Sequence, residues 1–246
     1  IPLRLVGSEM CIRDSPRSLG ERYIHIFGTD KVEGDAEVVL KNLFQAVDVK
    51  NFGATFVETG NSISITGAVQ IGQGFNKYED SRAEEQQILS PFRDGTKDTD
   101  SNGESKKSKQ SSLGTKIVSN EAHYVYPFVI NPQAYKEYEE LGVTQGYTQE
   151  DYDKFKRTSM VAATSYATNA KVGCENELAV FVETKPDLYL PNLSEYVTFS
   201  KRDGKNQITL TFDTLLNELQ DSILSVEIYY NPYTTELVQN IQKAVL

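Results

Sequence analysis

The sequence lacks the residues that mark several common classes of protein. It has two cysteines, Cys11 and Cys174, and two histidines, His25 and His123, and their spacing fits neither a disulfide framework nor a metal site. So few cysteines favour a reducing, cytoplasmic setting. Runs of about 18 apolar residues are missing, and so is the apolar segment of a signal peptide. We therefore expect a soluble protein without a membrane partner.

Positive net charge is also missing. The formal net charge is -10 at pH 7. Because phosphate neutralisation dominates sequence-independent binding to nucleic acids, this balance argues against a generic nucleic-acid binder. Any nucleic-acid site must therefore be local.

Patterns typical of enzymes are scarce. Neither histidine lies in a recognisable catalytic motif, although His123 and Glu121 could form an acid-base pair. The strand context favours an edge position for His123, and Cys174 has no visible activating partner. The glycines of GAVQIGQGFN lack the lysine spacing of a phosphate-binding loop. We expect no enzymatic activity and no cofactor, with an unrecognised hydrolase site as the weakest alternative.

The first residues do not resemble a structural element. The opening IPLRLVGSEMCIRDSPRSLG has neither a two-residue nor a 3.6-residue period, and VGSEMCIRDS resembles a translated adapter fragment. We expect residues 1–18 to be a non-native prefix. At 246 residues and 39% hydrophobic content, residues 19–246 then predict a single elaborated domain.

The remaining chain alternates between helical and extended patterns. Helices are predicted from Asp35 to about 47, from Asn131 to Gly142, from Thr148 to about 168, over 213–221 and from about 234. Strands are predicted over 51–58, 62–75, 123–130, 177–184, 207–212 and 223–230.

The order of these elements predicts an α+β fold. Helix, strand, strand, insertion, helix and strand make a βαββαβ ferredoxin-like, or RRM-like, palm with an antiparallel sheet and C-terminal α/β additions. The first palm strand is absent, unless RYIHIF (22–27) supplies part of it. Such a sheet often binds RNA, but the fold alone proves no function.

A long polar insertion separates two of the predicted strands. Residues 91–116 carry six basic and four acidic residues, a net of +2 that opposes the sign of the whole chain. Long loops in compact domains are usually functional arms or disordered tethers. We expect a flexible loop over about 90–117 that is either a functional arm or a solvated connection of mixed charge.

Several stretches, taken in order, resemble one family. They are DVKNFGATF (48–56), SISITGAVQIGQGFN (62–76), SPFRDG (90–95), SLGTKI (112–117), HYVYPFVINP (123–132) and TNAKVGCENELAVFVET (168–184). In this order and spacing the chain resembles the RAMP-type backbone subunit of type I-B CRISPR interference complexes, the Cas-seven family.

The resemblance implies a function. Subunits of this family have an RRM-like palm and a thumb, and they polymerise along CRISPR RNA, clamp its backbone and present it for pairing with target DNA. The implied partners are CRISPR RNA, target DNA through the guide, other copies of this chain and other subunits of the complex. The insertion from Pro91 to Lys116 is then the candidate for the thumb. An Asn-Pro-Asn-Gly-type motif, which usually opens the family's first strand, is missing here and leaves that strand in doubt.

Residues suited to a phosphate backbone lie within these stretches. Cations and amides can contact phosphate or sugar oxygens without reading bases, and the candidate RNA-binding residues are Lys50, Gln73, Asn76, Arg93, Lys116, Asn169 and Lys171. Each has a structural alternative: a helix-to-strand turn at 50–53, a bulged strand end at 72–76, solvation of the loop, and helix capping at 169–173.

An aromatic run adds a second kind of candidate. Tyr124, Tyr126 and Phe128 could stack on bases, but core and sheet packing is the favoured interpretation. The sequence as a whole predicts a non-enzymatic RNA-binding scaffold, present in several copies per complex. Its rival is a protein-interaction scaffold without a nucleic-acid ligand, which the acidic balance favours.

Overall fold

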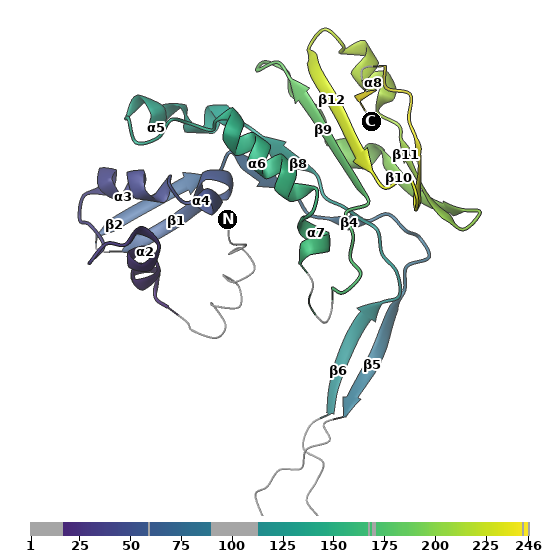
Figure 1. Cartoon of the computed structure of the whole chain (residues 1–246), viewed down its shortest axis with the longest axis horizontal. Coiled ribbons are helices and arrows are strands. Elements are labelled where there is room, and N and C mark those ends of the chain that lie inside the picture. The colour runs from purple at the N-terminus through teal and green to yellow at the C-terminus, as the bar shows by residue number, and fades with distance from the viewer. Residues whose placement is uncertain are drawn as a thin grey trace, which may run out of the picture.

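The computed structural model describes residues 17–58, 60–89, 113–166, 168, 171–242 and 244–245. Within them the expected α+β class is confirmed, with short helices and small, mainly antiparallel sheets (Figure 1). Most of the prefix, Arg93, Asn169 and residues 90–112 of the insertion lie outside the described residues. Among the described helices none is both long and apolar enough to cross a bilayer.

The N-terminal part packs three helices against one hairpin. The helices are α2 (Leu19–Phe27), α3 (Ala36–Leu43) and α4 (Val47–Phe52), and the hairpin pairs β1 (Gly53–Glu58) with β2 (Asn61–Thr66). Their core includes Tyr23, Val39, Phe44, Phe56 and Ile65. The Asp35 side chain accepts from Glu37 N–H, which confirms this predicted helix start.

The alternative that 22–27 supplies part of the first palm strand is wrong. A capping box between Ser18 and Glu21 starts a helix there, and Gly28 ends it in the left-handed conformation. Tyr23 and Phe27, four residues apart, lie on one helix face with their ring centroids 4.8 Å apart.

Two strands predicted as continuous are interrupted. Residues 62–75 divide into β2, β3 (Val69–Ile71) and β4 (Phe75–Asn76), and 123–130 divide into β7 (Tyr124–Val125) and β8 (Phe128–Ile130). β3 pairs with β8, and β4 pairs with β7. Tyr126 and Pro127 cause the break in the second stretch, because proline has no N–H for the ladder and both side chains press against the glycines opposite them.

The polar insertion begins and ends as strands. β5 (Ala83–Leu89) and β6 (Leu113–Ser119) pair antiparallel, with Ala83 opposite Ser119 and Leu89 opposite Leu113. This hairpin, which we call the arm, extends away from the rest of the protein (Figure 1). Its strands were not predicted, because their polar sequence shows no apolar alternation.

The middle helices begin where the caps predict. Asn131 caps the 3-10 helix η1 (Pro132–Tyr135), which continues into α5 (Lys136–Glu140), and Thr148 caps α6 (Gln149–Ser159). A further turn, α7 (Ala162–Ser165), follows a break. The prediction of one helix to about 168 is wrong because Asn176 donates to Ser159 O and accepts from Ala163 N–H, which holds the chain apart at the break.

The C-terminal part contains two three-stranded sheets over a second core. β9 (Leu178–Thr184) and β14 (Ala244–Val245) flank β12 (Ile223–Tyr230), and β11 (Lys205–Leu210) lies between β10 (Val197–Arg202) and β13 (Thr235–Val238). The short helices η2 (Leu193–Tyr196) and α8 (Asp213–Glu218) complete it. Residues from about 234 were predicted as a helix; β13 instead pairs parallel with β11, so this prediction is wrong.

Phe128 joins the two parts. Its ring lies 5.5 Å from that of Phe155 in α6 and 5.6 Å from that of Phe181 in β9. β8 thereby links the N-terminal core, which includes partly buried Phe155, to the strands of the second core.

Candidate nucleic-acid interface

Lys50 is engaged within the protein. Its Nζ lies 2.7 Å from Asp151 Oδ2, and the two side chains are only 19% and 13% exposed. Burial disfavours the charged carboxylate, but hydrogen bonds from Lys50 and Thr148 outweigh it and hold the pKa of Asp151 below its ordinary value. The pair lines a hollow of about 620 Å³, whose rim also carries Lys41 and Lys154. Each rim lysine pairs with a glutamate one helical turn earlier.

Gln73 and Asn76 lie together near the base of the arm. Gln73 is exposed in the link between β3 and β4. Asn76 Oδ1 accepts from the backbone N–H groups of His123, at 2.9 Å, and Tyr78, at 3.1 Å. Asn76 therefore has a structural task in joining the two strands at the arm base.

Lys116 lies on the arm itself. It is partly buried and sits opposite Gln86 in the register, with Glu84 and Glu85 on the same paired strand. Ile117, next to it, is 73% exposed. The described half of the arm thus offers one cation among acidic and apolar groups, and the four lysines and arginine of 91–112 lie outside the described residues.

Lys171 lies in the turn after α7. Its side chain is exposed, and Nζ is 4.5 Å from the centroid of the Tyr166 ring, a cation-π geometry. The alternative of helix capping by Gly173 is wrong, because α7 ends at Ser165 with Tyr166 as its C-cap, and Gly173, with φ +84°, lies in a separate turn.

The aromatic run divides into two roles. Phe128 packs internally, as the favoured interpretation expected, but Tyr124 and Tyr126 are 55% and 58% exposed. Their ring centroids are 6.3 Å apart. We call these two rings the aromatic surface. Asn76 pairs directly with Tyr124, whereas Phe75 pairs with Val125 and its side chain, 50% exposed, lies on the other face of the two strands.

The glycines of this region make room for protein atoms. A Cβ at Gly74 would lie 2.3 Å from the Tyr126 ring, and one at Gly72 would lie 2.8 Å from Pro127 Cγ. Glycine is required at both positions because the facing strand approaches so closely. The group that approaches these two glycines closely is therefore a part of the chain itself.

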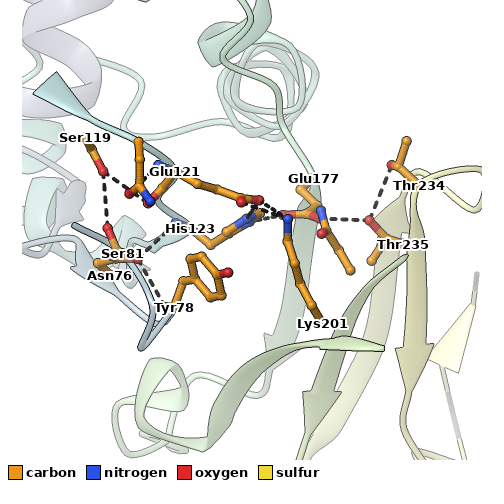
Figure 2. Close-up of polar contacts among 12 residues, drawn as sticks. Asn76, Tyr78, Ser81, Ser119, Glu121, His123, Glu177, Lys201, Thr234 and Thr235 are labelled. Atoms are coloured by element: carbon orange, nitrogen blue, oxygen red, sulfur yellow. Dashed lines mark hydrogen bonds and ion pairs between the residues drawn. The ribbon is translucent and has the colours of Figure 1, made fainter. Parts of the chain in front are cut away.

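A polar cluster fixes the base of the arm to the C-terminal strands (Figure 2). We call Glu121, His123, Glu177 and Lys201 the arm-base cluster. His123 Nε2 lies 3.1 Å from Glu121 Oε1 and its Nδ1 lies 2.7 Å from Glu177 Oε2, while Lys201 Nζ lies 2.7 Å from the Glu121 carboxylate. Hydrogen bonds from Lys201 and then His123 lower the pKa of Glu121, and the bond to Glu121 raises the pKa of Lys201.

The structure therefore brings some candidates together and separates others. Gln73, Asn76 and the aromatic surface share one location at the arm base, whereas Lys50 lies on α4 and Lys171 follows α7. The predicted neighbourhood of Glu121 and His123 is present, but Glu177 and Lys201 were not singled out from the sequence. Their partners lie 54 and 80 residues away, so no local pattern could have found them.

Comparison with models of protein families gives a match. The family model described as CRISPR-associated protein Cas7 matches residues 14–216, more than half of the chain. The match begins within the stretch expected to be a non-native prefix. No curated protein matches the sequence.

Proposed function

The chain belongs to the Cas7 family of CRISPR-associated proteins, and we propose that it binds CRISPR RNA as the repeating backbone subunit of a type I, I-B-like interference complex. In this role it polymerises with copies of itself along the guide, clamps the RNA backbone and presents the guide for pairing with target DNA. It acts in the cytoplasm as a scaffold without catalytic activity. The family match is the observation that carries the proposal.

The aromatic surface at the arm base supports an RNA ligand. Exposed aromatic rings stack on bases without reading their sequence, and each stacked base contributes about 1–3 kcal/mol by alanine substitution. Tyr124 and Tyr126 supply such rings, and Gln73, in the link before β4, is exposed. A scaffold that leaves recognition to base pairing needs this kind of sequence-independent contact.

Salt dependence tests the proposal directly. We expect the full chain to bind a single-stranded RNA containing a CRISPR repeat, with an affinity that falls as salt rises, because phosphate contacts release counterions. Fluorescence anisotropy over a series of salt concentrations gives the slope. Absent binding at low salt, or binding indifferent to salt, contradicts the proposal.

Two sets of variants separate the contacts. Replacing Arg93, Lys116 and Lys171 with alanine should weaken binding and reduce the salt slope by about one for each phosphate that no longer meets a cation. The arginine variants of the two lysines are the matched controls. Unchanged affinity in the triple variant removes these residues from the site.

The aromatic surface has its own control. We expect Tyr124→Ala and Tyr126→Ala each to weaken RNA binding by roughly five- to 150-fold, the equivalent of removing one stacked base, while the phenylalanine variants bind normally. Tyr233, which is 89% exposed on the turn before β13, is the matched position for an alanine control. Equal losses of affinity at all three positions contradict a local stacking site.

A protein-interaction scaffold is the second candidate. The net charge of -10 favours it, because an acidic surface repels phosphates. It predicts that the chain forms complexes with other subunits in the absence of RNA and that nuclease treatment leaves them intact. Assembly that requires RNA would contradict this second candidate.

A further inference from the structure

The arm depends on its base for direction. Within the described residues, β5 and β6 pair only with each other. An isolated two-stranded ribbon is marginally stable in water and cannot orient itself. Its attachments are the stretches after β4 and before β7, so contacts made by these stretches must set the angle at which the arm leaves the protein (Figure 1).

The arm-base cluster supplies these contacts. Glu121 and His123 follow directly on β6, whereas Lys201 is in β10 and Glu177 precedes β9 (Figure 2). Glu177 is itself held in place: its Oε1 accepts from Asn206 Nδ2 at 2.5 Å and from Thr235 Oγ1 at 3.0 Å. The part of the cluster that belongs to the C-terminal sheets is thus held by residues of three strands, β10, β11 and β13.

Both nitrogens of His123 face carboxylates. A carboxylate only accepts hydrogen bonds, and a neutral imidazole has one donor and one acceptor nitrogen. The contacts with Glu121 and Glu177 can therefore both form only if both nitrogens carry hydrogen. The imidazolium also balances the charge, because two cations, His123 and Lys201, then face the two carboxylates.

The ring is held flat within the cluster. His123 stacks on Phe199 of β10 with 3.7 Å between centroids and 18° between planes, and Tyr78 packs edge-on against both rings. Its side chain is 15% exposed.

We propose that His123 is a positioning residue that, as an imidazolium clamped between Glu121 and Glu177, fixes the direction of the arm relative to the C-terminal strands. Lys201 reinforces the clamp from β10. This deepens the proposed function, because the arm is the element expected to meet RNA and a neighbouring subunit. The tests use RNA-free protein, so their failure leaves the RNA-binding proposal standing.

The first test determines whether both ring nitrogens of His123 carry hydrogen. The chain has only two histidines, so a His25→Gln variant assigns their signals in a long-range ¹H–¹⁵N NMR spectrum. We expect the signals of His123 at neutral pH to show two protonated nitrogens. One bare nitrogen in the folded protein overturns the inference.

The second test measures how precisely the arm is positioned relative to the second core. Spin labels at Thr115→Cys in β6 and Leu224→Cys in β12, both exposed, report the distance between the arm and the second core by pulsed electron paramagnetic resonance. Cys11 and Cys174 are replaced by serine for this purpose. We expect a narrow distance distribution in the parent protein.

Two variants should broaden that distribution. His123→Phe keeps a ring to stack on Phe199 and removes both hydrogen bonds. Lys201→Met removes the outer ion pair at a side chain that is 42% exposed. His25→Phe and Lys205→Met are the matched controls and should leave the distribution narrow. If His123→Phe fails to fold, the distance distribution of Lys201→Met alone tests the inference. Unchanged distributions in the folded variants overturn the inference.

Discussion

A variant of Lys50 tests whether this residue stabilises the fold or contacts RNA. It was a candidate RNA contact, but its ammonium group already pairs with Asp151 at 2.7 Å, across the ends of α4 and α6. Lys50→Met keeps the length of the side chain and removes its charge. Asp151 retains the hydrogen bonds from Thr148 N–H and Oγ1–H.

The cost follows from the burial of the pair. Exposed ion pairs contribute about 0–1 kcal/mol, and breaking a fully buried pair costs about 3–5 kcal/mol. With 19% and 13% exposure this pair lies between these limits, so we expect a loss of about 1–3 kcal/mol. For a chain of this size the Tm should fall by roughly 2–12 °C.

The assay is denaturant unfolding of a double-mutant cycle with Asp151→Asn, which isolates the coupling between the two side chains. Lys41→Met, which breaks an exposed pair within one helix, is the control and should cost no more than about 0.5 kcal/mol. Because the pKa of Asp151 is lowered in the folded state, the pair stabilises the protein above the ordinary carboxylate range. Its contribution disappears as the pH falls through the lowered pKa, so parent and variant should converge in acid. Unchanged stability with a loss of RNA affinity would refute the reasoning.

Two further predictions concern close contacts within the protein. Tyr135 Oη bridges Ala68 N–H and Lys50 C=O in the first core, so Tyr135→Phe should cost about 2–4 kcal/mol in urea unfolding, since two buried groups lose their partner; an equal cost for Tyr138→Phe, whose hydroxyl is more exposed, would contradict this. Gly74→Ala should push the Tyr126 ring aside and weaken RNA binding about as much as Tyr126→Ala, with no further loss in the double variant. Additive losses in that double variant would show that the two positions act independently.

Local signals allowed much of the fold to be predicted. The caps at Asp35, Asn131 and Thr148 depend on side chains that bond backbone groups two or three residues away, so their patterns are readable in the sequence. The strands at 178–184 and 223–230 are rich in β-branched residues and have the predicted bounds to within a residue.

Long-range pairing could not be predicted in the same way. β13 was mistaken for a helix because its extended form depends on β11, whose residues lie about 30 positions earlier in the chain. The strands of the arm were missed because both of their faces meet solvent, and the alternation that reveals a strand comes from burying one face.

The candidate site divides along the same line. The Glu121–His123 contact was foreseen because the residues are neighbours, whereas the exposure of Tyr124 and Tyr126 depends on how Pro127 and Gly72 bend two distant strands together. The aromatic side chains were therefore expected in the core, and only the folded arrangement places two of them in solvent.

The order of the two cores along the chain has a consequence for synthesis on the ribosome. The first core uses residues up to about Phe155, so it can fold while the rest of the chain is still being made. The arm emerges early too, but the residues that anchor its base, Lys201, Asn206 and Thr235, are translated last. The base of the arm in a nascent chain is thus not fully anchored until the final strands emerge, and a chain halted before β13 would have a folded first half and an arm without these anchoring contacts.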